Sequence, residues 1–241
     1  MKKLLFFFSF LIVASCDDQT DDAASGSVIM PLKVGNYWTF VDSSFDDVGA
    51  FIEADTSTLS ITGKKTIEYG GASYEVFLWT WITYGSDHSW LMGNGDGGLY
   101  LFGGTSPKGD YILTKSLSIK YPAETGDEWE EYNVMYSSLD SSFSISDTSL
   151  TSCTSTDAVL PSPLADFICY RYEYSETFDV SKVMLNAAVG SGNQNAGFGK
   201  NRATTTVKLY YAPGIGYVGL VDEMDGIITY KKTIIAYLAE Q

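Results

Sequence analysis

The chain contains a single histidine, His88, which limits the chemistry that its side chains can perform. A Ser-His-Asp triad would depend on this one residue, and no G-x-S-x-G turn accompanies it. Zinc needs three or four protein ligands, and one histidine with two cysteines that we expect to pair does not supply a usual set. We therefore expect His88 to be an ordinary loop or strand-end residue, with no metal and no cofactor bound.

Acidic side chains gather in the stretch "PAETGDEWEE", which contains Glu124, Asp127, Glu128, Glu130 and Glu131. Two carboxylates at a suitable separation could act as a glycosidase pair, but sequence alone does not set that separation. A solvated start to a strand explains these charges better. We therefore predict that the protein is not an enzyme.

The stretch "MGNGDGGLYLFG" resembles a calcium-binding loop at Asn94, Asp96 and Gly97. Its first and twelfth ligand positions, however, hold Met92 and Gly103, where aspartate and glutamate belong. A tight hairpin turn is the better prediction for this stretch.

The first 16 residues have the layout of a signal peptide that ends in a cysteine. Lys2 and Lys3 give a positive start, an apolar run covers residues 4–13, and two small residues precede Cys16. A membrane-spanning helix needs about 20 apolar residues, so this run is too short, and we expect residues 1–15 to be cleaved. The ending "VASC" resembles the lipobox of bacterial lipoproteins, which implies that Cys16 is acylated and becomes the first residue of the mature chain.

Residues 16–27 are acidic and lack apolar periodicity, so we expect them to form a disordered, lipidated tether. The aspartates directly after Cys16 resemble the surface-export signal of Bacteroidetes lipoproteins. These resemblances imply a cell-envelope protein that is anchored by acyl chains in the outer membrane, on its periplasmic or its outward face.

The formal charge is −15, from 15 basic and 30 acidic residues, and becomes −17 once Lys2 and Lys3 leave with the signal peptide. Such a charge repels nucleic acid and anionic lipid headgroups. We therefore expect no nucleic-acid partner, and contact with the membrane through the acyl chains.

Residues 28–241 have the pattern of one β-rich domain. Runs of aromatic and β-branched residues alternate with clusters of Gly, Asn, Asp and Ser, as in "YWTFVD" and "TTTVKLYYA". Helical periodicity is confined to residues 179–189, so at most one or two short helices are expected. We predict an all-β fold with an antiparallel, strongly curved sheet or partial barrel, and a β-sandwich as the alternative.

The strand "YEVFLWTWITY" is apolar on both faces, since Phe77, Trp79 and Trp81 alternate with other large side chains. Such a strand is either covered on both sides or lines a cavity on one side, which favours a curved sheet. We take Phe77, Trp79, Trp81 and the nearby Trp90 as candidate ligand-binding residues, with core packing as the alternative role.

The stretches "PLKVGNYWTF" and "PAETGDEWEE" share Pro, Gly, Asn or Asp, and Trp at the same spacing. Proline favours an extended chain, glycine permits a tight turn, and the tryptophan can begin the next strand by packing in the core. We interpret the motif as a device that starts a strand. It also raises the possibility of an internal duplication of residues 31–121 in residues 122–241.

Three sequence elements of the chain resemble those of β-rich Bacteroidetes envelope lipoproteins. That group has a "PL-x-x-G-N-x-W" opening, matched from Pro31 to Trp38, and a late "A-P-G-V-G-L-V" element, matched in part from Ala212 to Val218. Its middle "P-A-G-T-F-x-C" element is matched incompletely by "PLADFIC". The resemblance implies a curved-sheet envelope domain and no particular activity.

Cys153 and Cys169 remain once Cys16 is acylated, and they are equidistant from Pro161. A hairpin that turned at Pro161 would place them opposite each other in an oxidising compartment. We therefore predict a Cys153–Cys169 disulfide, with two buried thiols as the alternative.

Two classes of function fit these features. In the first, a non-enzymatic envelope lipoprotein binds an apolar small molecule, or serves as an accessory subunit, through an aromatic-lined curved sheet. In the second, it is a surface glycan-binding module whose exposed Trp79, Trp81 or Trp90 stack on sugar rings. Tryptophans buried in a groove favour the first class, and an exposed planar row favours the second.

Overall fold

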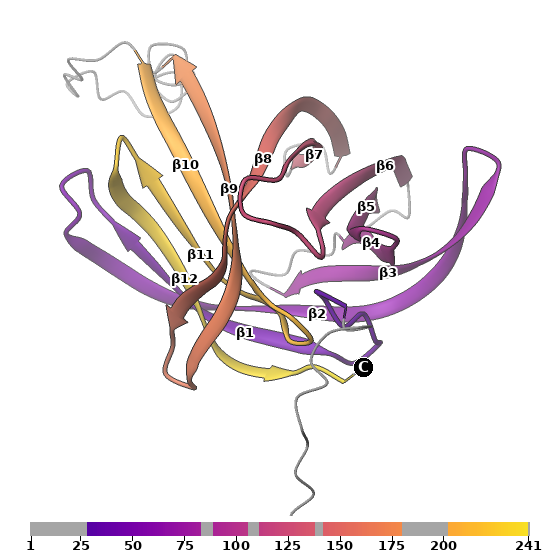
Figure 1. Cartoon of the computed structure of the whole chain (residues 1–241), viewed down its shortest axis with the longest axis horizontal. Coiled ribbons are helices and arrows are strands. Elements are labelled where there is room, and N and C mark those ends of the chain that lie inside the picture. The colour runs from indigo at the N-terminus through magenta and orange to yellow at the C-terminus, as the bar shows by residue number, and fades with distance from the viewer. Residues whose placement is uncertain (1–27, 83–88, 106–110, 138–141, 180–201, 241) are drawn as a thin grey trace, which may run out of the picture.

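The computed structural model describes residues 28–82, 89–105, 111–137, 142–179 and 202–240, and this part of the chain is all β (Figure 1). No described residue is helical, which confirms the predicted fold class. The helix considered at residues 179–189 lies, apart from Asp179, outside the described residues. The strands are β1 (Tyr37–Phe45), β2 (Phe51–Tyr69), β3 (Ala72–Ile82), β4 (Ser89–Gly95), β5 (Gly98–Thr105), β6 (Tyr111–Lys120), β7 (Glu128–Ser137), β8 (Ser142–Pro161), β9 (Asp166–Asp179), β10 (Arg202–Ala212), β11 (Gly216–Met224) and β12 (Ile227–Leu238).

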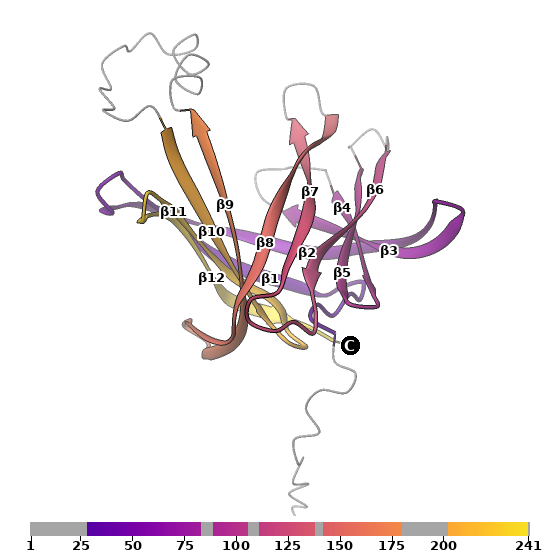
Figure 2. The ribbon, with the colours of Figure 1, turned by 45° about the horizontal axis from the view of Figure 1, so that its top comes forward.

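All twelve strands belong to one sheet with the order β6-β5-β4-β3-β2-β1-β12-β11-β10-β9-β8-β7. Every neighbouring pair is antiparallel, and β1 pairs with β12 to join the two ends of the chain. The sheet curls until its edge strands β6 and β7 face each other (Figures 1 and 2). This is the predicted strongly curved sheet or partial barrel, and not the β-sandwich.

Strands β6 and β7 are the two edge strands of the sheet and are not paired by a backbone ladder. Side chains close the seam between them. Trp129 Nε1 donates to the Ser118 carbonyl oxygen at 3.2 Å, and Ser118 Oγ donates to Glu131 Oε1 at 2.7 Å. Lys120 Nζ lies 3.0 Å from Asp127 Oδ2. The barrel is therefore nearly closed, with one join that lacks a backbone ladder.

The two tryptophan motifs form the same turn. In the first, Gly35 N donates to Ile61 O, Ile61 N donates to Asn36 O, and both bonds measure 2.9 Å. In the second, Gly126 N donates to Cys153 O, Cys153 N donates to Asp127 O, and both measure 2.8 Å. Both glycines have positive φ, 99° and 97°, which explains why the motif needs glycine there.

Six strands follow each of these turns, β1–β6 after the first and β7–β12 after the second. The second strand of each set is the longest, with 19 residues in β2 and 20 in β8. In both places the last strand of one set meets the first strand of the other, β6 with β7 and β12 with β1, but only β12 and β1 are joined by a backbone ladder. The duplication stays a prediction, and this parallel supports it.

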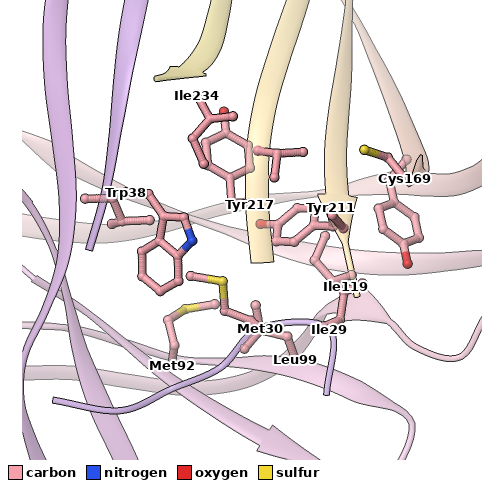
Figure 3. Packing of buried hydrophobic residues seen from close by; sticks show 14 of the residues in the cluster. Ile29, Met30, Trp38, Met92, Leu99, Ile119, Cys169, Tyr211, Tyr217 and Ile234 are labelled. Atoms are coloured by element: carbon pink, nitrogen blue, oxygen red, sulfur yellow. The ribbon is translucent and has the colours of Figure 1, made fainter. Parts of the chain in front are cut away.

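The main core fills the barrel and is closed at one end by the segment before β1. Ile29 and Met30 of this segment are fully buried, and Figure 3 shows Met30 beside Trp38 and Met92. Trp38 is also fully buried, and its Nε1 donates to Ile215 O at 2.7 Å. We call this end of the barrel the base, and the end that carries the β1–β2 and β11–β12 turns the rim.

A second, smaller core covers the outer face of β2–β6. It consists of Ile67, Val76, Leu91 and Phe102, with Tyr74, Leu78, Tyr100 and Leu113 packed around them. The Tyr74 and Phe102 rings lie 4.9 Å apart, and Lys115 Nζ lies 4.4 Å from the centre of the Tyr74 ring. This cluster explains why β3 is apolar on both faces.

Candidate ligand-binding sites

The four predicted aromatic residues all lie on the concave side of the sheet. Trp79 is 8% exposed and belongs to the main core, and Phe77, Trp81 and Trp90 are partly buried against it. Trp79 and Trp90 are direct cross-strand neighbours on β3 and β4. Buried Trp79 Nε1 has no hydrogen-bond partner among the described residues. The stripe therefore packs in the core, and its role in binding stays a prediction.

A buried cation covers Trp81. Lys232 Nζ on β12 lies 3.9 Å from the centre of the Trp81 ring, within cation–π distance. The Phe40 and Tyr217 rings lie 5.6 and 6.2 Å from the same ring. Trp81 is thus surrounded by groups of the protein itself, which leaves less of its ring for a ligand.

The side chain of Lys232 on β12 has partners on β1 and on β2. Its Nζ donates to Ser57 Oγ at 2.9 Å and lies 3.0 Å from Asp42 Oδ1, in an ion pair that lacks hydrogen-bond geometry. Burial lowers the pKa of Lys232, and Asp42 opposes that shift. Burial also raises the pKa of Tyr230, and Asp42 adds to that rise. Sequence reasoning missed this cluster, because a lysine in an alternating strand is indistinguishable from a surface residue.

The described part of the base contains a pocket of about 420 Å³ that is half open to solvent, which we call the basal cavity. Its wall combines the segment before β1, the β4–β5 turn, the β6–β7 connection and β9. The lining residues are Val28, Ile29, Asn94, Gly95, Asp96, Gly97, Gly98, Tyr121, Pro122 and Tyr170. The volume lies within the range of about 300 to 1,000 Å³ that is typical of small-molecule sites.

The walls of this basal cavity are fixed by specific contacts. Asn94 Nδ2 donates to Met30 O at 2.9 Å, which ties the β4–β5 turn to the N-terminal segment. Tyr121 N donates to Gly97 O at 2.8 Å, and the Tyr121 and Tyr170 rings meet edge to face at 5.3 Å. Gly98 has φ of 143°, and a Cβ there would collide with the Ile119 carbonyl oxygen. The hairpin turn predicted within residues 92–103 is confirmed, with Asp96 and Gly97 at its tip, and it also lines a cavity that the sequence did not reveal.

The acidic stretch at the start of β7 is split between two faces. Glu128 and Glu130 are exposed, as predicted for a solvated strand start. Glu131 points inward and accepts hydrogen bonds from Ser118 Oγ at 2.7 Å and Thr151 Oγ1 at 3.5 Å. Burial raises the pKa of Glu131 to about 7, against 4.5 for a solvated glutamate. The prediction of a wholly solvated acid cluster is therefore wrong for this residue.

The predicted disulfide is not formed in the structure, which leaves Cys153 and Cys169 as buried free thiols. The β8–β9 hairpin turns at residues 162–165 and not at Pro161, because Pro161 is already paired with Asp166. Cys153 lies opposite Tyr172, and Cys169 lies opposite Ala158. Equal spacing from Pro161 did not place the sulfurs opposite each other, because the hairpin turns beyond Pro161 and its register pairs Cys169 with Ala158.

Several predicted features lie outside the described residues, namely the signal peptide, Cys16, the acidic tether and His88. Within the described ranges, no group of three or more His, Cys, Asp or Glu side chains could hold a metal ion. Those same ranges contain no helix long and apolar enough to cross a membrane.

No protein-family model matches the chain, and no curated protein matches it significantly in sequence. A solved structure that it resembles is a presumed lipoprotein from Parabacteroides distasonis, with 10% sequence identity and a TM-score of 0.38. That match covers 89% of this chain and 100% of the other.

Proposed function

We propose that the protein is a lipid-anchored protein of the cell envelope, without enzymatic activity, that holds a small amphipathic ligand in its basal cavity. The observation that carries this proposal is the cavity of about 420 Å³ between the N-terminal segment, the β4–β5 turn and β9. Val28, Ile29 and Pro122 supply apolar wall, while Asn94 and Asp96 supply polar groups. A mixed lining of this kind suits a ligand with an apolar body and a few polar atoms.

The position of the cavity fits a membrane-derived ligand. Residues 17–27 link Cys16 to Val28, which lies in the cavity wall. A chain of that length reaches at most about 40 Å. Acylation of Cys16 in the outer membrane would therefore hold the base, with its cavity, close to the bilayer.

The glycan-binding alternative has less support from the described side chains. All five tryptophans are described, and each is buried or partly buried, so they form no exposed planar row. A sugar ligand in the basal cavity would have to use Tyr121 and Tyr170 instead.

The ligand proposal is tested by filling the cavity. The domain that begins at Ser27 is titrated with a fluorescent fatty-acid probe and, separately, with oligosaccharides. We expect saturable binding of the fatty-acid probe that is lost in Val28→Trp and kept in Val48→Trp, a matched change at an exposed rim residue. Binding of oligosaccharides alone, or equal binding of the probe by both variants, would contradict the proposal.

The anchor is tested separately by metabolic labelling with a fatty-acid analogue. We expect label on the wild-type protein and none on Cys16→Ala. Equal labelling of both would exclude the anchor without bearing on the cavity.

A further inference from the structure

Exposed apolar side chains gather at the rim, on two neighbouring hairpin turns. We call this set the rim patch, and its members are exposed by between 38% and 77%: Val48, Phe51, Ile52, Met224, Ile227 and Ile228. Single exposed apolar residues are normal, but a contiguous group on a soluble surface marks an interaction site.

The two turns of the rim patch lie side by side, as both views show (Figures 1 and 2). A Cβ on Gly49 of the β1–β2 turn would lie 3.6 Å from Ile227 Cγ2 on β12. Phe51 packs edge to face on Phe45 at 6.0 Å, and Met224 is the cross-strand partner of Ile227. These contacts hold the patch together and still leave its outer surface exposed.

The rim patch lies at the end of the barrel opposite the base. Strand β12 begins at Ile227 in the patch and ends beside Asn36, whose Nδ2 donates to Glu240 O at 2.8 Å. The segment that enters from the N-terminus packs at that same basal end. A barrel tethered through its N-terminus would therefore direct the rim patch away from the point of attachment.

The border of the rim patch is acidic. Asp47, Glu53 and Asp225 are exposed beside it.

Two of the described lysines near this end are already paired with acidic side chains. Lys208 is already ion-paired with Glu223 at 2.6 Å, and Lys232 is paired with Asp42. Among the described side chains near the patch, Lys231 remains beside the exposed Asp47 and Glu53. An apolar centre with an acidic border is complementary to an apolar surface bordered by lysine and arginine.

We propose that the rim patch is a docking surface for a protein partner that presents an apolar surface bordered by basic side chains. This inference is independent of the basal ligand, since it concerns the other end of the barrel. A second copy of the chain would bring two acidic borders together, and an anionic membrane would be repelled for the same reason.

The test uses the domain that begins at Ser27, because all twelve strands and both cores lie within residues 28–240. The probe is a short amphipathic peptide of leucine and lysine, and its control is the same peptide with glutamate in place of lysine. Two double variants are compared, Phe51→Ser/Ile52→Ser in the rim patch and Val159→Ser/Ile168→Ser on the β8–β9 hairpin. The four changed side chains are between 58% and 68% exposed, so these variants are matched and should fold.

We expect the lysine peptide to bind the wild type, to bind the rim variant about tenfold more weakly, and to bind the control variant as the wild type does. Added salt should weaken the binding, and the glutamate peptide should not bind. Equal loss in both variants, or equal binding of the two peptides, would overturn the proposal. So would dimerisation through the patch, or stronger binding to phosphatidylcholine or phosphatidylglycerol vesicles than to the peptide.

Discussion

Ser118 Oγ donates a hydrogen bond of 2.7 Å to the partly buried carboxyl group of Glu131 across the β6–β7 seam. This contact joins the two edge strands at a place where the equivalent β12–β1 join uses a backbone ladder. Thr151 on β8 supplies a second hydroxyl, and no described lysine or arginine forms an ion pair with Glu131. The closure of the barrel therefore depends partly on an acid whose protonation changes near neutral pH.

The first prediction concerns the pH dependence that Glu131 gives to stability. Its pKa is about 7 in the folded protein and near 4.5 when solvated, so the folded state binds the proton more tightly. The contribution of protonated Glu131 to the free energy of unfolding is complete below about pH 4.5 and is lost as the pH rises through 7. At pH 8, Glu131→Gln should therefore be more stable than the wild type by up to about 3 kcal/mol.

Urea denaturation of the wild type and Glu131→Gln at pH 5 and pH 8 measures this difference. The control is Glu130→Gln, a change to the exposed neighbour on the other face of β7. If the unfolding free energies of the wild type and Glu131→Gln depend on pH in the same way, the carboxyl group of Glu131 is solvated in the folded protein.

The second prediction concerns Lys232. Replacement by methionine leaves Asp42 partly buried without its counter-charge, which should cost about 3 kcal/mol of unfolding free energy. The double variant Lys232→Met/Asp42→Val removes both charges and should recover most of that loss. Thermal or urea unfolding of the four proteins in this double-mutant cycle gives the coupling, and strictly additive losses would mean that the two side chains do not interact.

The third prediction concerns Asn36, which is 1% exposed and joins the start of the barrel to its end. Its Nδ2 donates to Pro31 O and Glu240 O, and its Oδ1 accepts from Glu240 N at 3.1 Å. Asn36→Ala should destabilise the fold by about 3 kcal/mol, since each lost bond contributes about 1 kcal/mol. Asp127→Ala, at the corresponding position of the second turn, should cost clearly less in the same unfolding assay, because that residue is more exposed.

The fourth prediction concerns the two thiols. Burial raises the pKa of Cys169 to about 12 and also raises that of Cys153, so little reactive thiolate forms at pH 8. In the domain that begins at Ser27, both thiols should react slowly with a thiol reagent in buffer and rapidly in denaturant. Absence of any reaction in non-reducing denaturant would show that the disulfide forms after all.

Much of the fold follows from local pattern. Alternating aromatic and β-branched runs predict strands, and the two-faced apolar strand around Trp79 predicts strong curvature, because both of its faces must be covered. The Gly35 and Gly126 motifs predict matching turns, since only glycine adopts their φ readily. These predictions depend only on residues that are close together in the chain, so they can be made without knowledge of the rest of the fold.

Contacts between distant strands were decided only by the tertiary structure. The basal cavity needs Val28, Asn94, Pro122 and Tyr170 from four separate segments, and no short pattern marks their meeting. Glu131 looked solvated beside Glu128 and Glu130, yet curvature placed it in the seam. The cysteines were symmetric about Pro161 in sequence, but the hairpin turns at residues 162–165, so the two cysteines are not cross-strand partners. Sequence determines which way a side chain points along its own strand, whereas burial and partners depend on how far the whole sheet curls.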